Sequence, residues 1–359
     1  MAGTSINRIP LYSIILPALG LLTWLLVGKA GSPVLGLLLA AVLLGNVISA
    51  VHHAEVIALR VGEPFGTLVL ALAVTVIEVG MIVVLMMGAE PNPALMRDSI
   101  HAVVMLVLHG LAGLCIVVCA LYHREPEFHV AGANAFLAVL IPMAVLVLVM
   151  PNYVASAPGP FYSNLQLIFV SVVCLVLYGA FLFVQTNWHR AYFQPVGDDD
   201  SVPLEHPSPR IVLASFGLLL VALVSVVLLA KSLTPALDAA LAAVHAPVAV
   251  IGIVIAAIVL LPESVAAVRA AARNRLQSSL NLALGSGVAS IGLTVPTVAV
   301  VSRIIDQPLE LGISPSNSVL MALGVLIAVI TYGTGRTNVL AGIVHLVLLA
   351  AYLFLTFVP

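Results

Sequence analysis

The sequence predicts an all-α membrane protein with about 11 transmembrane helices, and three observations support this class. Apolar residues make up 62% of the 359 residues and charged residues only 8%, whereas a soluble domain carries about 25% charged residues. Apolar stretches of about 20 residues recur, the length that a helix needs to cross about 30 Å of hydrocarbon. The alternation typical of membrane β-strands is absent from the sequence. We therefore expect lipid to cover most of the protein.

Eleven apolar segments follow one another along the chain. Each should be helical, because backbone polar groups cannot remain unpaired in lipid. The first segment lacks a small-residue cleavage site, so we interpret it as a retained helix and not as a signal peptide. The expected spans are residues 11–29, 33–51, 66–88, 100–121, 132–150, 165–185, 211–231, 247–268, 277–301, 316–333 and 338–357.

The basic residues predict the orientation of these spans. A cytoplasmic N-terminus places nine of the 13 Lys and Arg residues on the cytoplasmic side, as the positive-inside rule requires. The longest loop then also lies in the cytoplasm, and its acidic run Asp198–Asp200 is either solvated or attracts cations. The expected organisation is an N-terminal helix (1–32), a first repeat (33–185), this acidic loop (186–210) and a second repeat (211–359).

The two predicted repeats contain five spans each. An odd number gives them opposite orientations, the layout of inverted-repeat transporters, whose site lies near the bilayer midplane between the repeats. Glu78 lies twelve residues after Gly66 on the second span of the first repeat. Glu263 lies eleven residues after Gly252 on the second span of the second repeat. Each repeat thus places one carboxylate on the equivalent helix.

Glu78 and Glu263 are the acidic residues that lie well inside the predicted spans. A charge at bilayer depth costs at least about 2.5–3.5 kcal/mol, so such residues are usually functional; the alternative is a protonated Glu that hydrogen-bonds to a neighbouring helix. Burial favours the protonated form of a carboxyl group. A proton and a metal cation can then compete for the same oxygens, and Pro262 frees a backbone carbonyl beside Glu263 that suits a hard cation. We expect secondary active exchange of a metal cation for protons.

Other polar side chains are candidates for supporting roles. Thr75 lies one turn before Glu78. His109 lies deep in the fourth span and shares a face with His101, although a hydrogen-bonded packing role is the commoner one for a single His. Glu55 could line a cytoplasmic entrance or be a solvated charge. The ninth span carries three hydroxyls on one face, Ser286, Ser290 and Thr294. They could assist the site or simply form interhelical hydrogen bonds. Asn281 adds an amide nearer the cytoplasmic end of the same span.

The cysteines and the overall charge indicate no further ligand. Cys115 and Cys119 share a helix face and could bind a soft metal, but small apolar packing residues are far commoner because no third ligand completes the set. We expect no cofactor, since the metal cation is cargo. No basic cluster suggests nucleic acid, and the sequence leaves the oligomeric state open.

Two stretches resemble the conserved regions of the proton-coupled branch of the calcium/cation exchanger superfamily. The first contains Glu55, Gly62, Gly66 and Glu78; the second contains Leu261-Pro262-Glu263-Ser264, Asn274-Arg275-Leu276 and Ala283-Leu284-Gly285-Ser286. The resemblance covers both repeats, and the bacterial ChaA type of calcium, sodium or potassium/proton antiporter looks most similar. It implies a bacterial inner membrane, and it implies cation and proton binding by the two glutamates with help from Ser286 and backbone carbonyls.

The chain departs from the pattern of that family at both glutamates. The usual Gly-Asn pair is replaced by Val74-Thr75-Val76-Ile77 and by Leu260-Leu261-Pro262, and the Gly-Ser pair of the first half by His109-Gly110. These changes remove side-chain oxygens, so sodium or potassium stays open beside calcium.

Three other classes of function were weighed against an antiporter. A passive cation channel is the main alternative, but channels usually form an oligomeric pore with rings of carboxylates or carbonyls. An intramembrane enzyme is disfavoured because neither HExxH nor GxSxG is present. A membrane scaffold would give no reason for two carboxylates inside the spans.

Overall fold

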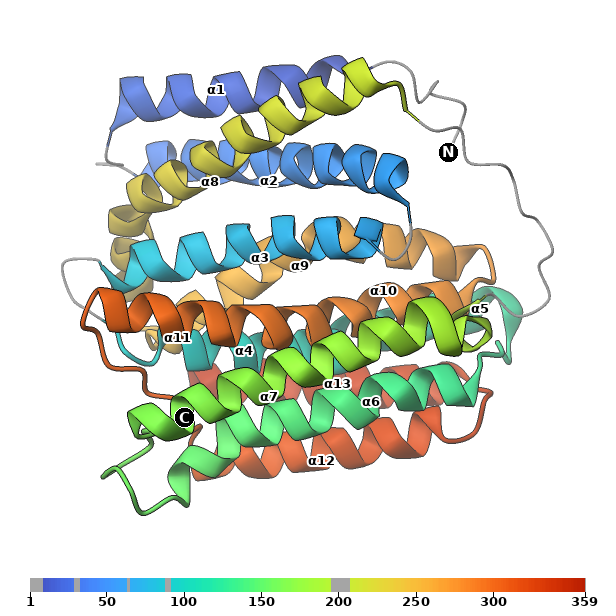
Figure 1. Ribbon diagram of the computed structural model, residues 1–359. Helices are drawn as coiled ribbons and strands as arrows, with labels where there is room; N and C mark the ends of the chain where they lie inside the picture. The colour runs from blue at the N-terminus through green and yellow to red at the C-terminus, as the bar shows by residue number, and fades with distance from the viewer. Residues whose placement is uncertain (1–8, 29–32, 63–64, 88–91, 195–206, 359) are drawn as a thin grey trace. The chain divides into compact units, whose positions relative to one another are not determined.

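The computed structural model consists of helices joined by short connections (Figure 1). It describes residues 9–28, 33–62, 65–87, 92–194 and 207–358. Within these residues, ten helices are long and apolar enough to cross a membrane, and an eleventh, α1, is apolar but shorter. The described residues form no β-strand beyond two isolated bridges. The predicted fold class, with about eleven apolar helices, is confirmed.

The chain forms two compact units, each described here by itself. Unit 1 comprises Met1–Asn92 and Asp199–Ala246, and unit 2 comprises Pro93–Asp198 and Pro247–Pro359. Of the basic residues that predict the orientation, Arg8 and Lys29 lie outside the described residues, as does the acidic run Asp198–Asp200.

The described residues of unit 1 form four helices, and α2 packs against α1, α3 and α8 (Figure 1). Two of them are longer than predicted, because they continue through polar residues that a hydropathy window excludes but a helix tolerates on one face. The helix α2 ends at Val61 and not near residue 51, so Glu55 lies on a helix and not at a loop; α8 ends at Ala243 and not near residue 231. The bounds are α1 (Leu11–Val27), α2 (Pro33–Val61), α3 (Phe65–Met86) and α8 (Pro209–Ala243).

A proline determines how α1 is held in unit 1. Pro17 has no backbone N–H, so it cannot donate to the carbonyl of Ser13 four residues earlier. That carbonyl accepts two hydrogen bonds from α2 instead, from Ser49 Oγ and from His53 Nε2, both at 2.9 Å. The α8 hydroxyl Ser225 Oγ donates to the carbonyl of Pro17 at 3.1 Å. The interruption of the helix ladder thus supplies polar contacts between α1 and both neighbours.

Unit 2 contains the remaining helices. Their bounds in the first half of the chain are α4 (Leu95–Met105), η1 (Leu106–Leu111), α5 (Ala112–His123), α6 (Val130–Ala144), η2 (Val145–Val149), η3 (Met150–Asn152), α7 (Asn164–Phe183), η4 (Val184–Trp188) and η5 (Arg190–Phe193). Those in the second half are α9 (Ala249–Ala272), α10 (Leu276–Ala289), η6 (Ser290–Thr294), α11 (Val295–Ile304), α12 (Pro315–Tyr332) and α13 (Val339–Phe357).

Four spans of unit 2 are composite, and two of them have a π-helical turn between two α-helices. The elements α4, η1 and α5 form the span Leu95–His123, and α10, η6 and α11 form the span Leu276–Ile304. In each, the central turn, η1 or η6, is π-helical. These are the third spans of the two predicted repeats, so the repeats share an interruption of the helix as well as the number of spans. Single π-helical turns are frequent at functional sites.

Two glycines allow helices to approach closely. A Cβ on Gly252 of α9 would lie 2.6 Å from the carbonyl carbon of Asp98 and 2.7 Å from the nitrogen of Ser99, both on α4. A Cβ on Gly66 of α3 would lie 2.6 Å from the carbonyl oxygen of Ala58 on α2. These are the glycines that precede Glu263 and Glu78 in the sequence, so close backbone packing fixes the start of both glutamate-bearing helices.

We expect Gly252→Ala to destabilise the protein by about 1–3 kcal/mol, because the added methyl group forces the α4 and α9 backbones apart. The matched control is Gly217→Ala on α8, where a Cβ meets nothing within 4 Å. The control should be neutral or stabilising by up to about 1 kcal/mol through helix propensity. Melting temperatures of the detergent-solubilised variants measure both effects, and equal values for the two would contradict the packing described.

Candidate functional site

Glu78 lies on α3, thirteen residues after its first residue, Phe65. Its side chain has no exposed surface. The helix packs against α2 and α8 within unit 1, and most of its residues are apolar. The sequence thus places a carboxyl group in the interior of the protein, about 20 Å along a membrane-spanning helix.

Glu263 lies on α9, fourteen residues after its first residue, Ala249. The helix continues through the preceding Pro262, and the residues from 261 to 264 are partly exposed. Because Pro262 has no N–H, the carbonyl of Ile258 lacks the usual helix donor. One residue beyond the carboxylate, Ser264 Oγ donates to the carbonyl of Leu260 at 2.7 Å. Backbone oxygens and one hydroxyl therefore lie on the same stretch of helix as this carboxylate.

The two glutamates occupy corresponding positions in their helices. The helix α3 has 22 residues and α9 has 24. At a rise of about 1.5 Å per residue, each carboxylate-bearing residue lies about 4 Å beyond the middle of its helix. Each helix is also the second span of its predicted repeat. Glu78 belongs to unit 1 and Glu263 to unit 2.

Two of the predicted supporting residues lie in unit 1. Thr75 is buried, and its hydroxyl donates to the carbonyl of Ala71 at 2.8 Å, which leaves its oxygen lone pairs available to a ligand. Glu55 is exposed on the last third of α2. The two residues therefore differ in burial, and only Thr75 lies in the protein interior.

The predicted polar residues of the ninth span fall into two groups. Ser290 and Thr294 are buried and form the first and last residues of η6, while Ser286 is partly exposed on α10. Asn281 has a structural role, because its Nδ2 donates to the carbonyl of Phe193 at 2.6 Å and its Oδ1 accepts from Gln277 Nε2 at 2.8 Å. These bonds fix the short helix η5 to α10.

His109 lies on the π-helical turn η1 and is fully buried. Its Nδ1 lies 2.8 Å from Nδ1 of His345 on α13. His101 of α4 contacts the same helix, with its ring edge-on to Tyr352 at a centroid distance of 4.9 Å. The two histidines therefore share a face, as their spacing predicts, and that face packs on α13. His345 was not identified from the sequence, since 236 residues separate it from its partner.

An ion-pair cluster in unit 2 was also not predicted. Arg97 Nε lies 2.9 Å from Asp98 Oδ1, and the same guanidinium pairs with Glu310. All three residues were assigned to loops or span ends on the basis of sequence alone. Only the adjacent Arg97 and Asp98 give a local signal of pairing; Glu310 is too far along the chain to be recognised. Because the Arg97 guanidinium already pairs with both carboxylates, the cluster is a weaker candidate for cation binding than the two glutamates.

The described residues include no group of three or more His, Cys, Asp and Glu side chains arranged to hold a metal ion. The cysteines Cys115, Cys119 and Cys174 are buried free thiols. A cation bound at either glutamate would therefore need backbone carbonyl or hydroxyl oxygens as additional ligands.

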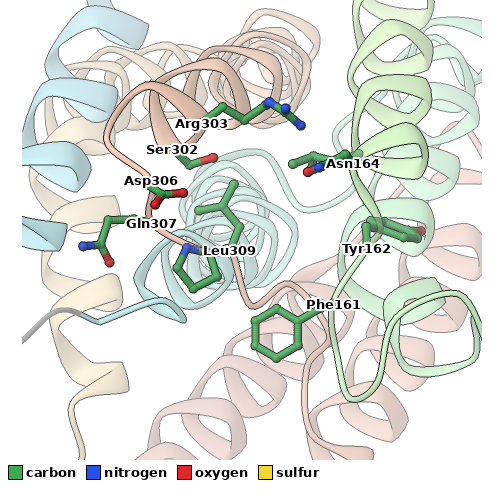
Figure 2. Close-up of a pocket in the computed structure, with 10 residues that line it drawn as sticks. Phe161, Tyr162, Asn164, Ser302, Arg303, Asp306, Gln307 and Leu309 are labelled. Atoms are coloured by element: carbon green, nitrogen blue, oxygen red, sulfur yellow. The ribbon is translucent and has the colours of Figure 1, made fainter.

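A polar cavity of about 300 Å³ lies where α7 begins and α11 ends, and Figure 2 shows Arg303 of α11 reaching toward Asn164 of α7. None of the predicted site residues lines it. At its wall, Tyr162 donates to the carbonyl of Leu146 at 2.6 Å, and burial raises the pKa of the Tyr162 hydroxyl to about 12. Tyr162 thus remains a protonated donor at neutral pH, and this cavity offers an environment unlike that of the buried glutamates.

Comparison with known proteins identifies the family. Residues 32–187 and 214–358 match the profile of the family described as sodium/calcium exchanger protein. The chain belongs to this family. The matched segments cover both predicted repeats. Membership makes the protein a multi-pass membrane transporter and confirms that it is not an enzyme.

Two curated relatives of this family member match along nearly their whole length. A Sinorhizobium fredii protein, y4hA, which carries a provisional name as an ionic transporter, is 46% identical over 98% of this chain and 97% of its own. The sodium-potassium/proton antiporter ChaA of Escherichia coli is 34% identical over 96% of both chains. The predicted resemblance to cation/proton antiporters of the ChaA type is confirmed.

Solved structures of other exchangers share the fold. The structure of native YfkE aligns with a TM-score of 0.73 and 19% identity, covering 97% of this chain and 98% of that one. The H+/Ca2+ exchanger CAX aligns with a TM-score of 0.70 and 14% identity, covering 95% and 87%. At these identities the alignments establish the fold alone.

We expect Asn281→Ala to lower the stability of the protein by about 1–3 kcal/mol, because it removes the hydrogen-bond donor to the carbonyl of Phe193 and the acceptor for Nε2 of Gln277. Thermal unfolding in detergent measures the loss. Asn187→Ala is the matched control, since that exposed amide bonds only to its neighbour Thr186; the change should stay within about 0.5 kcal/mol. Unchanged stability of Asn281→Ala together with lost transport would instead assign Asn281 to the ion path.

Proposed function

We propose that this protein exchanges a metal cation for protons across the bacterial inner membrane, with Glu78 and Glu263 each binding the cation and the proton in turn. The observation that carries the proposal is the corresponding position of the two carboxylates, about 4 Å beyond the middle of α3 and of α9. Membership of the exchanger family and the names of its cation/proton antiporters support it.

The depth of the glutamates supports a shared transport role. With an odd number of spans in each repeat, α3 and α9 cross the membrane in opposite directions, as the positive-inside bias also predicts. A residue slightly beyond the middle of either helix then lies close to the centre of the bilayer whichever way the helix runs. Ions that enter from both sides can reach such a depth only through a polar path in the protein.

Competition between two cations explains the coupling. An ionised carboxylate at this depth is unstable unless a positive charge neutralises it. A proton does so by forming the neutral acid, and a metal ion does so by direct coordination. Since both occupy the same oxygens, binding of one releases the other. If only the neutralised site changes its access from one side to the other, the two ions must move in opposite directions.

The ligand supply favours sodium or potassium over calcium. Calcium takes six to eight oxygen ligands. The residues before Glu78 and Glu263 contribute only the Thr75 hydroxyl as a side-chain oxygen, because the others are aliphatic or proline. The relative that is 34% identical is named as a sodium-potassium/proton antiporter. We therefore propose a monovalent cation as the main substrate, with calcium a weaker one.

We expect Glu78→Gln and Glu263→Gln each to abolish cation-driven proton release from proteoliposomes, because Gln keeps the size and hydrogen bonding of Glu but cannot bind a proton or a cation by charge. The matched control is Glu127→Gln, which removes an exposed carboxylate paired with Arg336 and should leave exchange unchanged. Insertion of each variant is checked by its yield and its elution in size-exclusion chromatography. Full exchange by either inserted variant would remove that residue from the site.

The preferred ion follows from adding Na+, K+ or Ca2+ separately to proteoliposomes that contain a pH-sensitive dye. We expect larger proton release with Na+ and K+ than with Ca2+, because few side-chain oxygens are available near the glutamates. The membrane potential is clamped during the measurement. Under that condition an antiporter uses a cation gradient to build a proton gradient, whereas a passive channel dissipates the cation gradient and builds none.

A further inference from the structure

Three polar side chains of unit 2 form a buried hydrogen-bonded chain, here called the histidine chain: His109, His345 and Thr331. The Nδ1 atoms of the two imidazoles lie 2.8 Å apart, and Nε2 of His345 lies 3.1 Å from Oγ1 of Thr331. Both imidazoles have no exposed surface, while Thr331 is 9% exposed. The rings are inclined by only 25° to one another. The neutral groups thus make a continuous path of nitrogen and oxygen atoms through an apolar interior.

The histidine chain runs from the end of a helix to the middle of a membrane span. Thr331 is the penultimate residue of α12 and precedes the exposed residues Gly333 and Thr334. His345 lies six residues into α13. His109 is the central residue of the span Leu95–His123, fourteen residues from each end. One end of the chain is therefore next to an exposed loop and the other is at the depth of the span centre.

The short distance between the imidazoles requires one hydrogen between them. Two bare lone pairs or two N–H groups would repel at 2.8 Å, so one Nδ1 donates and the other accepts. If His109 donates, His345 carries its hydrogen on Nε2 and donates to Thr331. If His345 donates, its Nε2 accepts from the Thr331 hydroxyl and His109 carries its hydrogen on Nε2. The two arrangements differ only by a shift of hydrogens along the chain.

The inner end of the chain is open. Nε2 of His109 has no hydrogen-bond partner among the residues described. It lies over Gly324 of α12, where a Cβ would be only 2.3 Å away. A buried polar atom without a partner is costly, and a histidine kept only for packing would be better replaced by an apolar residue of similar size. The open nitrogen is therefore the feature that a purely structural role does not explain.

Few charged groups face this chain within unit 2. Six elements pack against η1: α4, α5, α9, α10, α12 and α13. Of these, α10 has no titratable side chain. The ring of Tyr332 lies parallel to that of His345 at 5.9 Å, and His345 meets His109 directly. The titratable residues on the packed elements are Arg97, Asp98, His101, Cys115, Cys119, Tyr122, His123, Glu263, Arg269, Tyr332, His345 and Tyr352.

We infer that the histidine chain carries protons between the loop after α12 and the middle of the span Leu95–His123. A proton that binds Nε2 of His109 releases the hydrogen on its Nδ1 to His345. The Nε2 hydrogen of His345 then passes to Thr331, whose own hydroxyl hydrogen leaves to water at the loop. One proton enters, one leaves, and no bond between heavy atoms changes. The inference rests on the proposed exchange, because it concerns the path of the exchanged proton.

Replacing the titratable groups tests this inference. We expect His109→Asn, His345→Asn and Thr331→Val to lower cation-driven proton release in proteoliposomes by about tenfold or more, because an amide or a methyl group cannot pass a proton on. The rate is measured at several pH values from about 6 to 9, so that both the rate and its pH profile are compared with those of the wild type. Exchange of isotopically labelled Na+ for unlabelled Na+ at equal pH moves no proton, and it should stay within about twofold of wild type.

Two matched variants serve as controls. Thr331→Ser keeps the hydroxyl and should retain the wild-type rate and pH profile. His101→Asn replaces another buried histidine of the span Leu95–His123, one that is not part of the histidine chain. This variant should also retain the wild-type rate and pH profile. If the histidine variants do not fold, the comparison of Thr331→Val with Thr331→Ser decides the question.

Three results would overturn the inference. An unchanged rate and pH profile in folded His109→Asn and His345→Asn would show that protons take another path. An equal loss of proton-coupled and of labelled-sodium exchange would indicate a structural role. A wild-type protein that exchanges labelled sodium but never releases protons would refute the proposed antiport and the histidine chain together, whereas loss in the chain variants alone leaves the antiport intact.

Discussion

A polar group within the spans is costly unless it finds a partner inside the protein, because hydrocarbon offers no hydrogen bonds. This constraint explains why the chain is helical, and it explains the pairing of Arg97 with Asp98 and Glu310 in unit 2. It also separates the remaining polar residues into two classes. Asn281 satisfies both sides of its amide with structural bonds. The two glutamates can gain or lose a proton, so their partner can change, and the proposed exchange depends on such a change.

Equivalence between the two halves of the chain connects the fold to the site. Each half has a carboxylate at the same position of its second span and a π-helical turn in its third span. Stability alone does not require such agreement, since membrane helices need only apolar residues and paired backbone groups. A transporter needs such equivalence if its cation site is to open alternately to the two sides of the membrane. The histidine chain includes His109 of the turn η1, whereas the turn η6 carries the buried hydroxyls of Ser290 and Thr294.

Hydropathy and the cost of intramembrane charge were enough to predict the fold class, the approximate spans and the position of Glu78 and Glu263. The ends of α2 and α8 were missed because polar residues such as Glu55 stop a hydropathy window but do not stop an amphipathic helix. The partners of His109 and Arg97 were missed for a different reason. His345 and Glu310 are more than two hundred residues away in the chain, and no local pattern encodes a contact at that separation.

Pro17 makes the first helix difficult to remove. A version of the chain that starts at α2 would leave Ser49 and His53 without the Ser13 carbonyl that they now bind. Two donors would then face acyl chains, and inserting them would cost several kilocalories per mole unless water or another protein replaced the lost acceptor. The helix α1 is thus held to α2 through the Ser13 carbonyl, which is available because Pro17 has no N–H. Removing α1 would require compensating mutations on α2.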